Sequence, residues 1–90
     1  MKTKNVIVTS AGWQDVETLG SLTFENNSTY SVSIIGNSRC EVCLSDTTPA
    51  NTLKGHPLKA DDSFTFTYSG YGLWVKKSGF DNTSITVVVS

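Results

Sequence analysis

Apolar and polar residues alternate along much of this chain, and this period of two restricts the fold more than any other feature. The clearest segment is residues 64–68 (FTFTY), where three aromatic side chains fall on one face and two threonines on the other. Because successive side chains of a strand point to opposite faces, the pattern predicts a strand with one buried face. No segment has a convincing helical period, although residues 14–19 could form one turn.

Further segments have the same alternation or a cluster of β-branched residues, and short runs of Gly, Asn and Ser separate many of them. The predicted strands are residues 5–9, 22–25, 30–34, 40–44, 64–68, 73–76 and 85–89. The breaks at 26–28, 36–38, 69–70 and 78–79 are typical of hairpin turns. A length of 90 residues allows one domain, spanning residues 1–90. We therefore predict an all-β fold: a single antiparallel β-sandwich or short barrel of about seven strands.

The surface of such a domain is expected to be rich in hydroxyl groups, because 24 of the 90 residues are Ser or Thr and only 17% are charged. On strands, these hydroxyls take the outward positions that charges would otherwise occupy. Seven basic and eight acidic residues give a net charge of -1, which argues against nucleic-acid or membrane-surface binding. No apolar stretch approaches the roughly 20 residues of a bilayer span.

The first and last predicted strands are apolar on both faces. Residues 6–8 (VIV) and 87–89 (VVV) leave no face for solvent, which is unsuitable for an exposed edge strand. Either these strands lie inside the sheet or a second subunit covers them. We favour the second alternative, so Val6, Val8, Val87 and Val89 are candidate inter-subunit contacts. The run at 6–8 is shorter than the roughly 7 to 15 apolar residues of a signal peptide, so general secretion is not expected.

Two cysteines form a CxxC pattern in a segment with β-type sequence. On a strand, Cys40 and Cys43 point to opposite faces and lie about 10 Å apart by rise. That separation exceeds the roughly 7 Å limit for a disulfide. Structural zinc needs four ligands, and the Cys and His residues of this sequence are only these two cysteines and His56. We expect structural cysteines, with Cys40 in the core, and no metal.

Residues for catalysis are few. His56 lies in a turn-rich loop between Gly55 and Pro57, and Asp61-Asp62 reads as a polar turn at the start of a strand rather than a calcium site. No P-loop, dinucleotide fingerprint or HExxH motif occurs. We predict no catalytic residues, no cofactor and no enzymatic activity.

Three aromatic residues, Trp13, Tyr71 and Trp74, are candidates for contact with a partner or a glycan. If Leu73 and Val75 point into the core, Trp74 points outward. Exposed Trp and Tyr can stack on sugar rings or anchor a protein interface. The alternative, in which Trp74 closes one end of the core, stays open.

Several segments of this chain resemble the small structural proteins of tailed bacteriophages. The similar segments are residues 15–19 (DVETL), 22–28 (LTFENNS), 43–50 (CLSDTTPA), 58–66 (LKADDSFTF), 73–77 (LWVKK) and 85–89 (ITVVV). Together they span roughly residues 15 to 89. At Asp61-Asp62 the family pattern has a glycine, which this chain lacks.

The resemblance implies a virion component made in the bacterial cytoplasm: a capsid decoration protein or a head- or tail-associated subunit. It implies a symmetric homo-oligomer, with a trimer favoured, bound to the major capsid protein or another virion protein. No catalytic residues come with it. The alternative is a small carbohydrate-binding module that uses Trp13, Tyr71 and Trp74, with a host-surface glycan as its partner.

Overall fold

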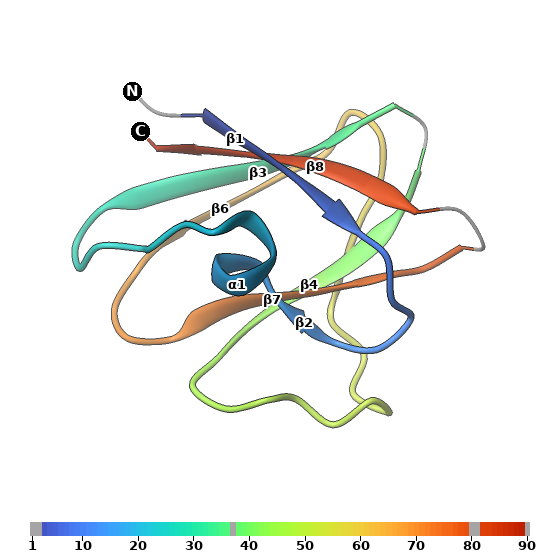
Figure 1. The fold of residues 1–90 in the computed structure, drawn as a ribbon, viewed down its shortest axis with the longest axis horizontal. Helices are drawn as coiled ribbons and strands as arrows, with labels where there is room; N and C mark the ends of the chain where they lie inside the picture. Colours follow the sequence, from blue (N-terminus) through green and yellow to red (C-terminus); the bar gives the residue numbers. More distant parts are fainter. Residues whose placement is uncertain (1–2, 37, 80–81, 90) are drawn as a thin grey trace.

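The computed structural model describes residues 3–36, 38–79 and 82–89, which form strands and one short helix (Figure 1). In chain order, the elements are β1 (Thr3–Val8), β2 (Gln14–Asp15), α1 (Val16–Gly20), β3 (Thr29–Ile35), β4 (Cys40–Ser45), β5 (His56–Leu58), β6 (Ser63–Thr67), β7 (Gly72–Lys77) and β8 (Thr83–Val89). They build two packed antiparallel sheets that do not close into a barrel, which confirms the predicted all-β sandwich.

The strands pair from the two ends of the chain inward. Sheet A has the order β1-β8-β3-β6 and sheet B the order β2-β7-β4-β5. The pairs β1–β8, β2–β7, β3–β6 and β4–β5 are those of one long antiparallel hairpin whose tip is residues 46–55. This hairpin is rolled so that β8 also pairs with β3, and β7 with β4. Such an eight-stranded, two-sheet roll is a jelly roll.

The connections differ from the predicted hairpins. The breaks at 36–38, 69–70 and 78–79 join strands of different sheets; of these residues, Asn37 lies outside the described part of the chain. Gly36 and Gly70 have φ of 87° and 103°, which suits the abrupt change of direction. Of the consecutive strands within residues 3–36, 38–79 and 82–89, only β4 and β5 pair with each other, through the long connection 46–55.

Two short strands were not predicted from the sequence pattern, and one predicted strand, residues 22–25, is absent. β2 and β5 have two and three residues, too few to display a period. Residues 22–25 form an irregular connection after α1. The helix begins where Asp15 accepts a hydrogen bond from the Glu17 N–H and ends at Ser21, which has a left-handed conformation.

The core lies between the sheets and is built mainly from aliphatic side chains. Its fully buried members include Val6, Val8, Val16, Val32, Cys40, Val42, Leu58, Leu73, Val75 and Ile85. An aromatic cluster fills one end, where the Phe24 ring lies 4.7 Å from Tyr30 and 5.4 Å from Phe66 between centroids. Phe24 comes from the irregular connection, so this segment is held in place by the core that it completes.

Candidate functional site

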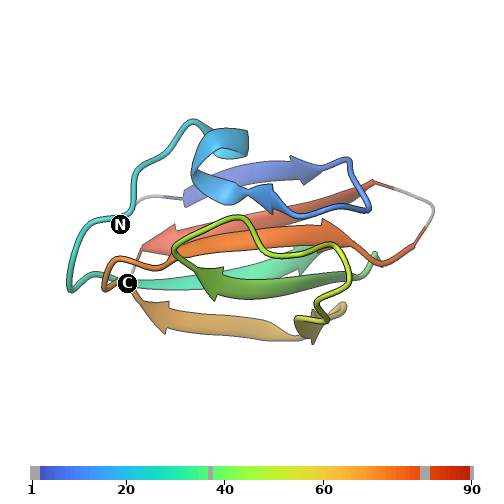
Figure 2. The same cartoon turned by 90° about the horizontal axis from the view of Figure 1, so that it is seen from below.

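The loop 46–55 covers the outer face of sheet B and the aromatic residues on it; Figure 2 shows the loop crossing in front of that sheet. Trp13 is only 7% exposed, and its indole Nε1–H donates to the Ala50 carbonyl at 3.1 Å. Trp74 is half-buried, and its Nε1–H donates to the Ser45 carbonyl at 3.2 Å. Both indole donors are therefore used within the chain.

Lys76 holds the middle of the same loop through hydrogen bonds to its backbone. It points away from the core, yet it is only 8% exposed because the loop folds over it. Its Nζ donates to the carbonyls of Asn51 at 3.1 Å and Leu53 at 2.9 Å, and lies 4.7 Å from the centre of the Trp13 ring. Beside it, the Glu41 carboxylate accepts from the Gly55 N–H at 2.8 Å.

The three predicted contact aromatics thus differ in accessibility. Tyr71, in the connection before β7, is 52% exposed, whereas Trp13 is buried and Trp74 is half-buried. Trp13 is packed by the loop, so its ring lacks the exposure that the contact prediction assumed. Lys76 and Glu41 were missed as organising residues; the available signal was their opposite charge at outward positions, which the register places opposite each other.

The terminal valines face the core of their own chain. Val6, Val8 and Val87 are at most 3% exposed, and Val89 is half-buried against the core. β8 lies inside sheet A between β1 and β3, whereas β1 is an edge strand with Ile7 59% exposed on its outer face. A partner would therefore meet Ile7 or the backbone edge of β1 rather than these valine side chains.

The outer face of sheet A is a continuous array of small uncharged side chains, here called the hydroxyl face. It consists of Thr3, Asn5 and Ile7 on β1, Ser84, Thr86 and Val88 on β8, Thr29, Ser31, Ser33 and Ile35 on β3, and Ser63, Thr65 and Thr67 on β6. Neighbouring strands are linked through these side chains: Thr29 and Thr67 at 3.0 Å, and Ser31 and Thr65 at 3.1 Å. None of these outward residues is ionisable, which is unusual for a solvent-exposed sheet.

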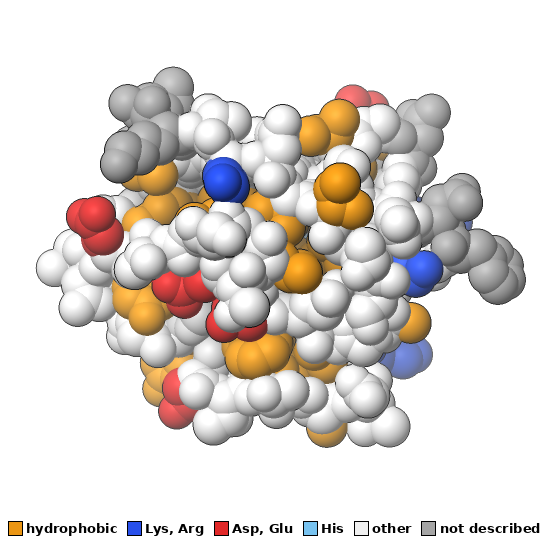
Figure 3. Space-filling view, in the orientation of Figure 1, with side chains coloured by type: hydrophobic (Ala, Val, Ile, Leu, Met, Phe, Trp, Pro, Cys, Tyr) orange, Lys and Arg blue, Asp and Glu red, His pale blue; other side chains and the backbone are white. Residues whose placement is uncertain are grey.

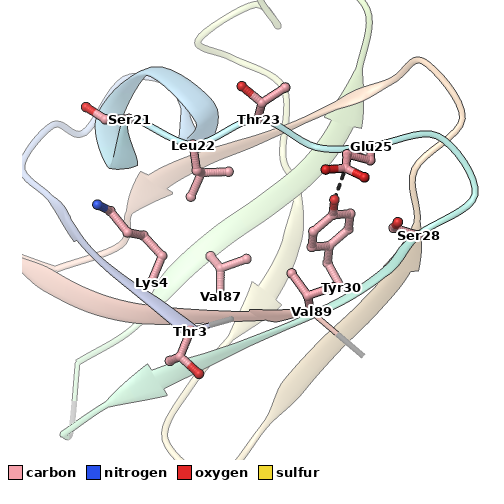
Figure 4. A pocket seen from close by; sticks show the side chains of 10 residues that line it. All are labelled: Thr3, Lys4, Ser21, Leu22, Thr23, Glu25, Ser28, Tyr30, Val87 and Val89. Atoms are coloured by element: carbon pink, nitrogen blue, oxygen red, sulfur yellow. Dashed lines mark hydrogen bonds between the residues drawn. The ribbon is translucent and has the colours of Figure 1, made fainter. Parts of the chain in front are cut away.

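A groove of about 770 Å³ lies between the connection 21–28 and the paired strands β1 and β8 (Figure 4). It is lined by Thr3, Lys4, Ser21, Leu22, Thr23, Glu25, Ser28, Tyr30, Val87 and Val89. The Tyr30 hydroxyl accepts from the Glu25 N–H at 2.7 Å, which helps to fix the connection above the groove. Charged side chains are few and scattered on this side of the molecule, as Figure 3 shows. With one cation and one anion in its lining, the groove selects neither sign of ligand charge.

The cysteines have the environment of structural residues. Burial, with a smaller contribution from the Glu41 carboxylate, raises the pKa of Cys40 from 9.0 to about 12. Burial also raises the pKa of Cys43, against an opposing effect of the Lys76 ammonium. Neither thiol is activated as a nucleophile. His56 is exposed, with its ring 5.6 Å from Phe64.

Across residues 3–36, 38–79 and 82–89, no group of three or more His, Cys, Asp and Glu side chains is arranged to hold a metal ion. Within the same ranges, no helix is long and apolar enough to cross a membrane. Comparisons of the chain with protein-family models, with curated proteins and with solved structures give no significant match.

Proposed function

We propose that the chain is a non-enzymatic virion structural protein, a capsid decoration or head- or tail-associated subunit that docks on a tailed-phage particle as a symmetric homo-oligomer. The observation that carries the proposal is the hydroxyl face. A surface of this extent without ionisable groups suits broad, flat contact, because no charge must be stripped of water when a partner covers it. Ile7 and Ile35, 59% and 44% exposed, add apolar area to the same face.

The strength of such docking comes from repetition. Hydroxyl and methyl contacts are individually weak, since a net hydrogen bond contributes only about 0.5–1.5 kcal/mol. A symmetric oligomer on a regular shell makes the same contact several times. Because these contacts are linked, the overall affinity is much higher than that of one contact. The jelly-roll strand order supports this proposal by analogy at the level of the fold, because domains of some viral capsid proteins have this fold.

The jelly roll is also a fold of lectins, so a carbohydrate-binding module is the second candidate. The observation that favours it is the 52% exposure of Tyr71, with Trp74 half-buried on the strand that follows. A glycan array tests this candidate. Binding that is lost in Tyr71→Ala and Trp74→Ala would support it, and an array without hits would remove it.

The virion proposal is tested by particle composition. Phage production is induced in bacterial cells that carry the gene. The phage particles are banded on a density gradient, and the chain is sought in the band by mass spectrometry. We expect it at a fixed molar ratio to the major capsid protein, and we expect Ser33→Lys, which places a charge in the hydroxyl face, to lower that ratio. Recovery of the chain only in the soluble fraction would contradict the proposal.

A further inference from the structure

The four edges of the two sheets are protected to different degrees against pairing with another strand. β2 has only two residues, and β5 has three, including Pro57. Short strands and proline are two of the devices that block pairing of an edge with a further strand.

β1 is also protected. Lys4 pairs with Val87 in register and therefore lies on the inward side of the strand, and an inward-pointing charge at an edge opposes pairing. α1 packs beside the same strand, so closely that a Cβ on Gly20 would lie 2.8 Å from the Val6 side chain. Figure 2 shows α1 over this edge of the sandwich.

β6 has none of these protections. Its five residues (SFTFT) contain no charge and no proline, and the unbroken register with β3 leaves no bulge. Among the described strands it pairs with β3 alone, so its other side presents free backbone donors and acceptors. In the described part of the chain the helix is α1, and the β6 edge lies on the opposite side of the sandwich from it (Figure 2).

We propose that β6 pairs with the β6 strand of a second copy of this chain, antiparallel about a two-fold axis at Thr65. In this register Thr65 faces its own equivalent, Ser63 faces Thr67, and Phe64 faces Phe66. Hydroxyl side chains then meet on the outer face and aromatic rings on the inner one, both of which are favourable cross-strand pairs. The outer contacts continue the hydroxyl pairs that already join β3 to β6.

The charged residues near β6 favour the same antiparallel arrangement. The acidic residues near β6, Asp61 and Asp62, both precede the strand. Antiparallel pairing about Thr65 sends the two acidic ends to opposite ends of the ladder and places Asp62 opposite Tyr68 of the second copy. The two Asp62 positions are then about 20 Å apart, from six residues of strand rise. A parallel arrangement would bring the carboxylates together.

The dimer joins two sheets A into one eight-stranded sheet and doubles the hydroxyl face. The inference rests on the proposed function, because docking as a symmetric homo-oligomer needs a subunit that self-associates. It favours a two-fold dimer over the trimer expected from the resemblance. A short ladder buries a small area, so we expect micromolar affinity in solution.

Sedimentation equilibrium of the intact chain across the micromolar range tests the pairing. We expect a monomer–dimer equilibrium, with a dimer of twice the 9.7 kDa chain mass. Thr65→Lys, which sets two ammonium groups opposite each other, should weaken the dimer by about tenfold or more. The matched control is Thr3→Lys, an exposed threonine on the outer face of the other edge strand, which should leave the dimer unchanged. A wild-type monomer at every concentration, or equal effects of both variants, would overturn the proposal.

Disulfide trapping tests the register without depending on the lysine variant. Directly opposed residues of an antiparallel pair have Cα atoms about 4.5–5.5 Å apart, within disulfide range. In a Cys43→Ser background, Thr65→Cys should oxidise to a covalent dimer, and Thr3→Cys should stay monomeric. Free thiols in both variants would overturn the proposal. A dimer trapped at position 65 that does not band with particles would keep this inference and remove the proposed function. A chain that bands with particles but stays monomeric in solution would remove this inference and keep the virion part of the proposed function without its homo-oligomer.

Discussion

Single side chains on the outer face of sheet B determine where the loop 46–55 lies. Lys76 is the most important of them, because its ammonium group holds two loop carbonyls and covers the Trp13 ring. A buried cation with carbonyl partners fixes a loop more firmly than an exposed ion pair, since water competes less for the charge.

The first prediction concerns this contact. Lys76→Met keeps a long apolar stem but loses both hydrogen bonds, and we expect the free energy of unfolding to fall by about 1.5–3 kcal/mol. Urea denaturation measures the loss, and tryptic cleavage after Lys54 should become faster because the loop is released. Lys59→Met, at an exposed lysine, is the control and should change neither. Unchanged stability in Lys76→Met would show that the loop is held by other contacts.

The second prediction concerns the turn that leads into β6. The Asp62 N–H donates to the Lys59 carbonyl at 3.0 Å, and Asp61 has φ of 72°, a conformation that favours glycine. We expect Asp61→Gly to raise the thermal midpoint, with a gain of about 0.5–1 kcal/mol. Asp61→Asn shows whether charge contributes, and Asp62→Gly, outside the left-handed region, should destabilise. A lower midpoint for Asp61→Gly would contradict the prediction.

The third prediction concerns the Cys40 thiol. Because burial raises its pKa from 9.0 to about 12, the unfolded chain loses this proton at a lower pH than the folded chain. The stability that the neutral thiol contributes is present below pH 9 and is lost as the pH rises from 9 towards 12. Urea denaturation of the wild type should therefore show a steeper loss above pH 9 than denaturation of Cys40→Ala. Parallel pH profiles would mean that Cys40 titrates alike in both states.

At the scale of elements, the position of the loop 46–55 depends on the close approach of Gly55 to the Trp13 ring and to the backbone of β4. A Cβ on Gly55 would lie 2.5 Å from the Trp13 ring and 2.6 Å from the Val42 carbonyl oxygen, so backbone or ring must shift. We expect Gly55→Ala to destabilise by about 1–3 kcal/mol, measured by denaturation, with increased Trp13 fluorescence quenching by acrylamide. Gly79→Ala is the control, because its Cβ would meet no atom within 4 Å. Equal stability of the two variants would contradict this account of the loop.

The sequence pattern located most of the long strands because a period of two is a local property. It could not locate β2 or β5, which take their strand conformation from pairing with β7 and β4. Nor could it distinguish a hairpin from a crossing between sheets at Gly36 or Gly70. Both kinds of turn use the same residue types, and pairing between distant strands decides the outcome.

The candidate site was predictable to a smaller extent. The hydroxyl face follows from alternation alone once the strands are placed, as residues 64–68 illustrate. The burial of Trp13 and Lys76 does not, because it depends on where the loop 46–55 folds. No local pattern in a loop specifies the sheet face that it covers.

At the scale of the whole molecule, the rolled hairpin makes every sheet depend on residues far apart in the chain. β1 pairs with β8, and β2 with β7. Non-local pairing slows folding because long loops must close before the contacts between distant strands form. We expect refolding in the range of milliseconds to seconds, measured by stopped-flow tryptophan fluorescence. Complete refolding within microseconds would contradict the strand order.

The position of β1 has a further consequence for biosynthesis. Among the strands that the structure describes, β1 pairs with β8 alone, and residues 9–82 must be made between the two. At a translation rate of about 5–20 residues per second, the segment Val6-Ile7-Val8 stays unpaired for several seconds until β8 has been synthesised. During that time the ribosome carries an unpaired apolar strand, which is the kind of segment that chaperones shield. Sheet A is therefore completed only after β8 emerges, and a ribosome that stalls before β8 leaves behind a chain prone to aggregate.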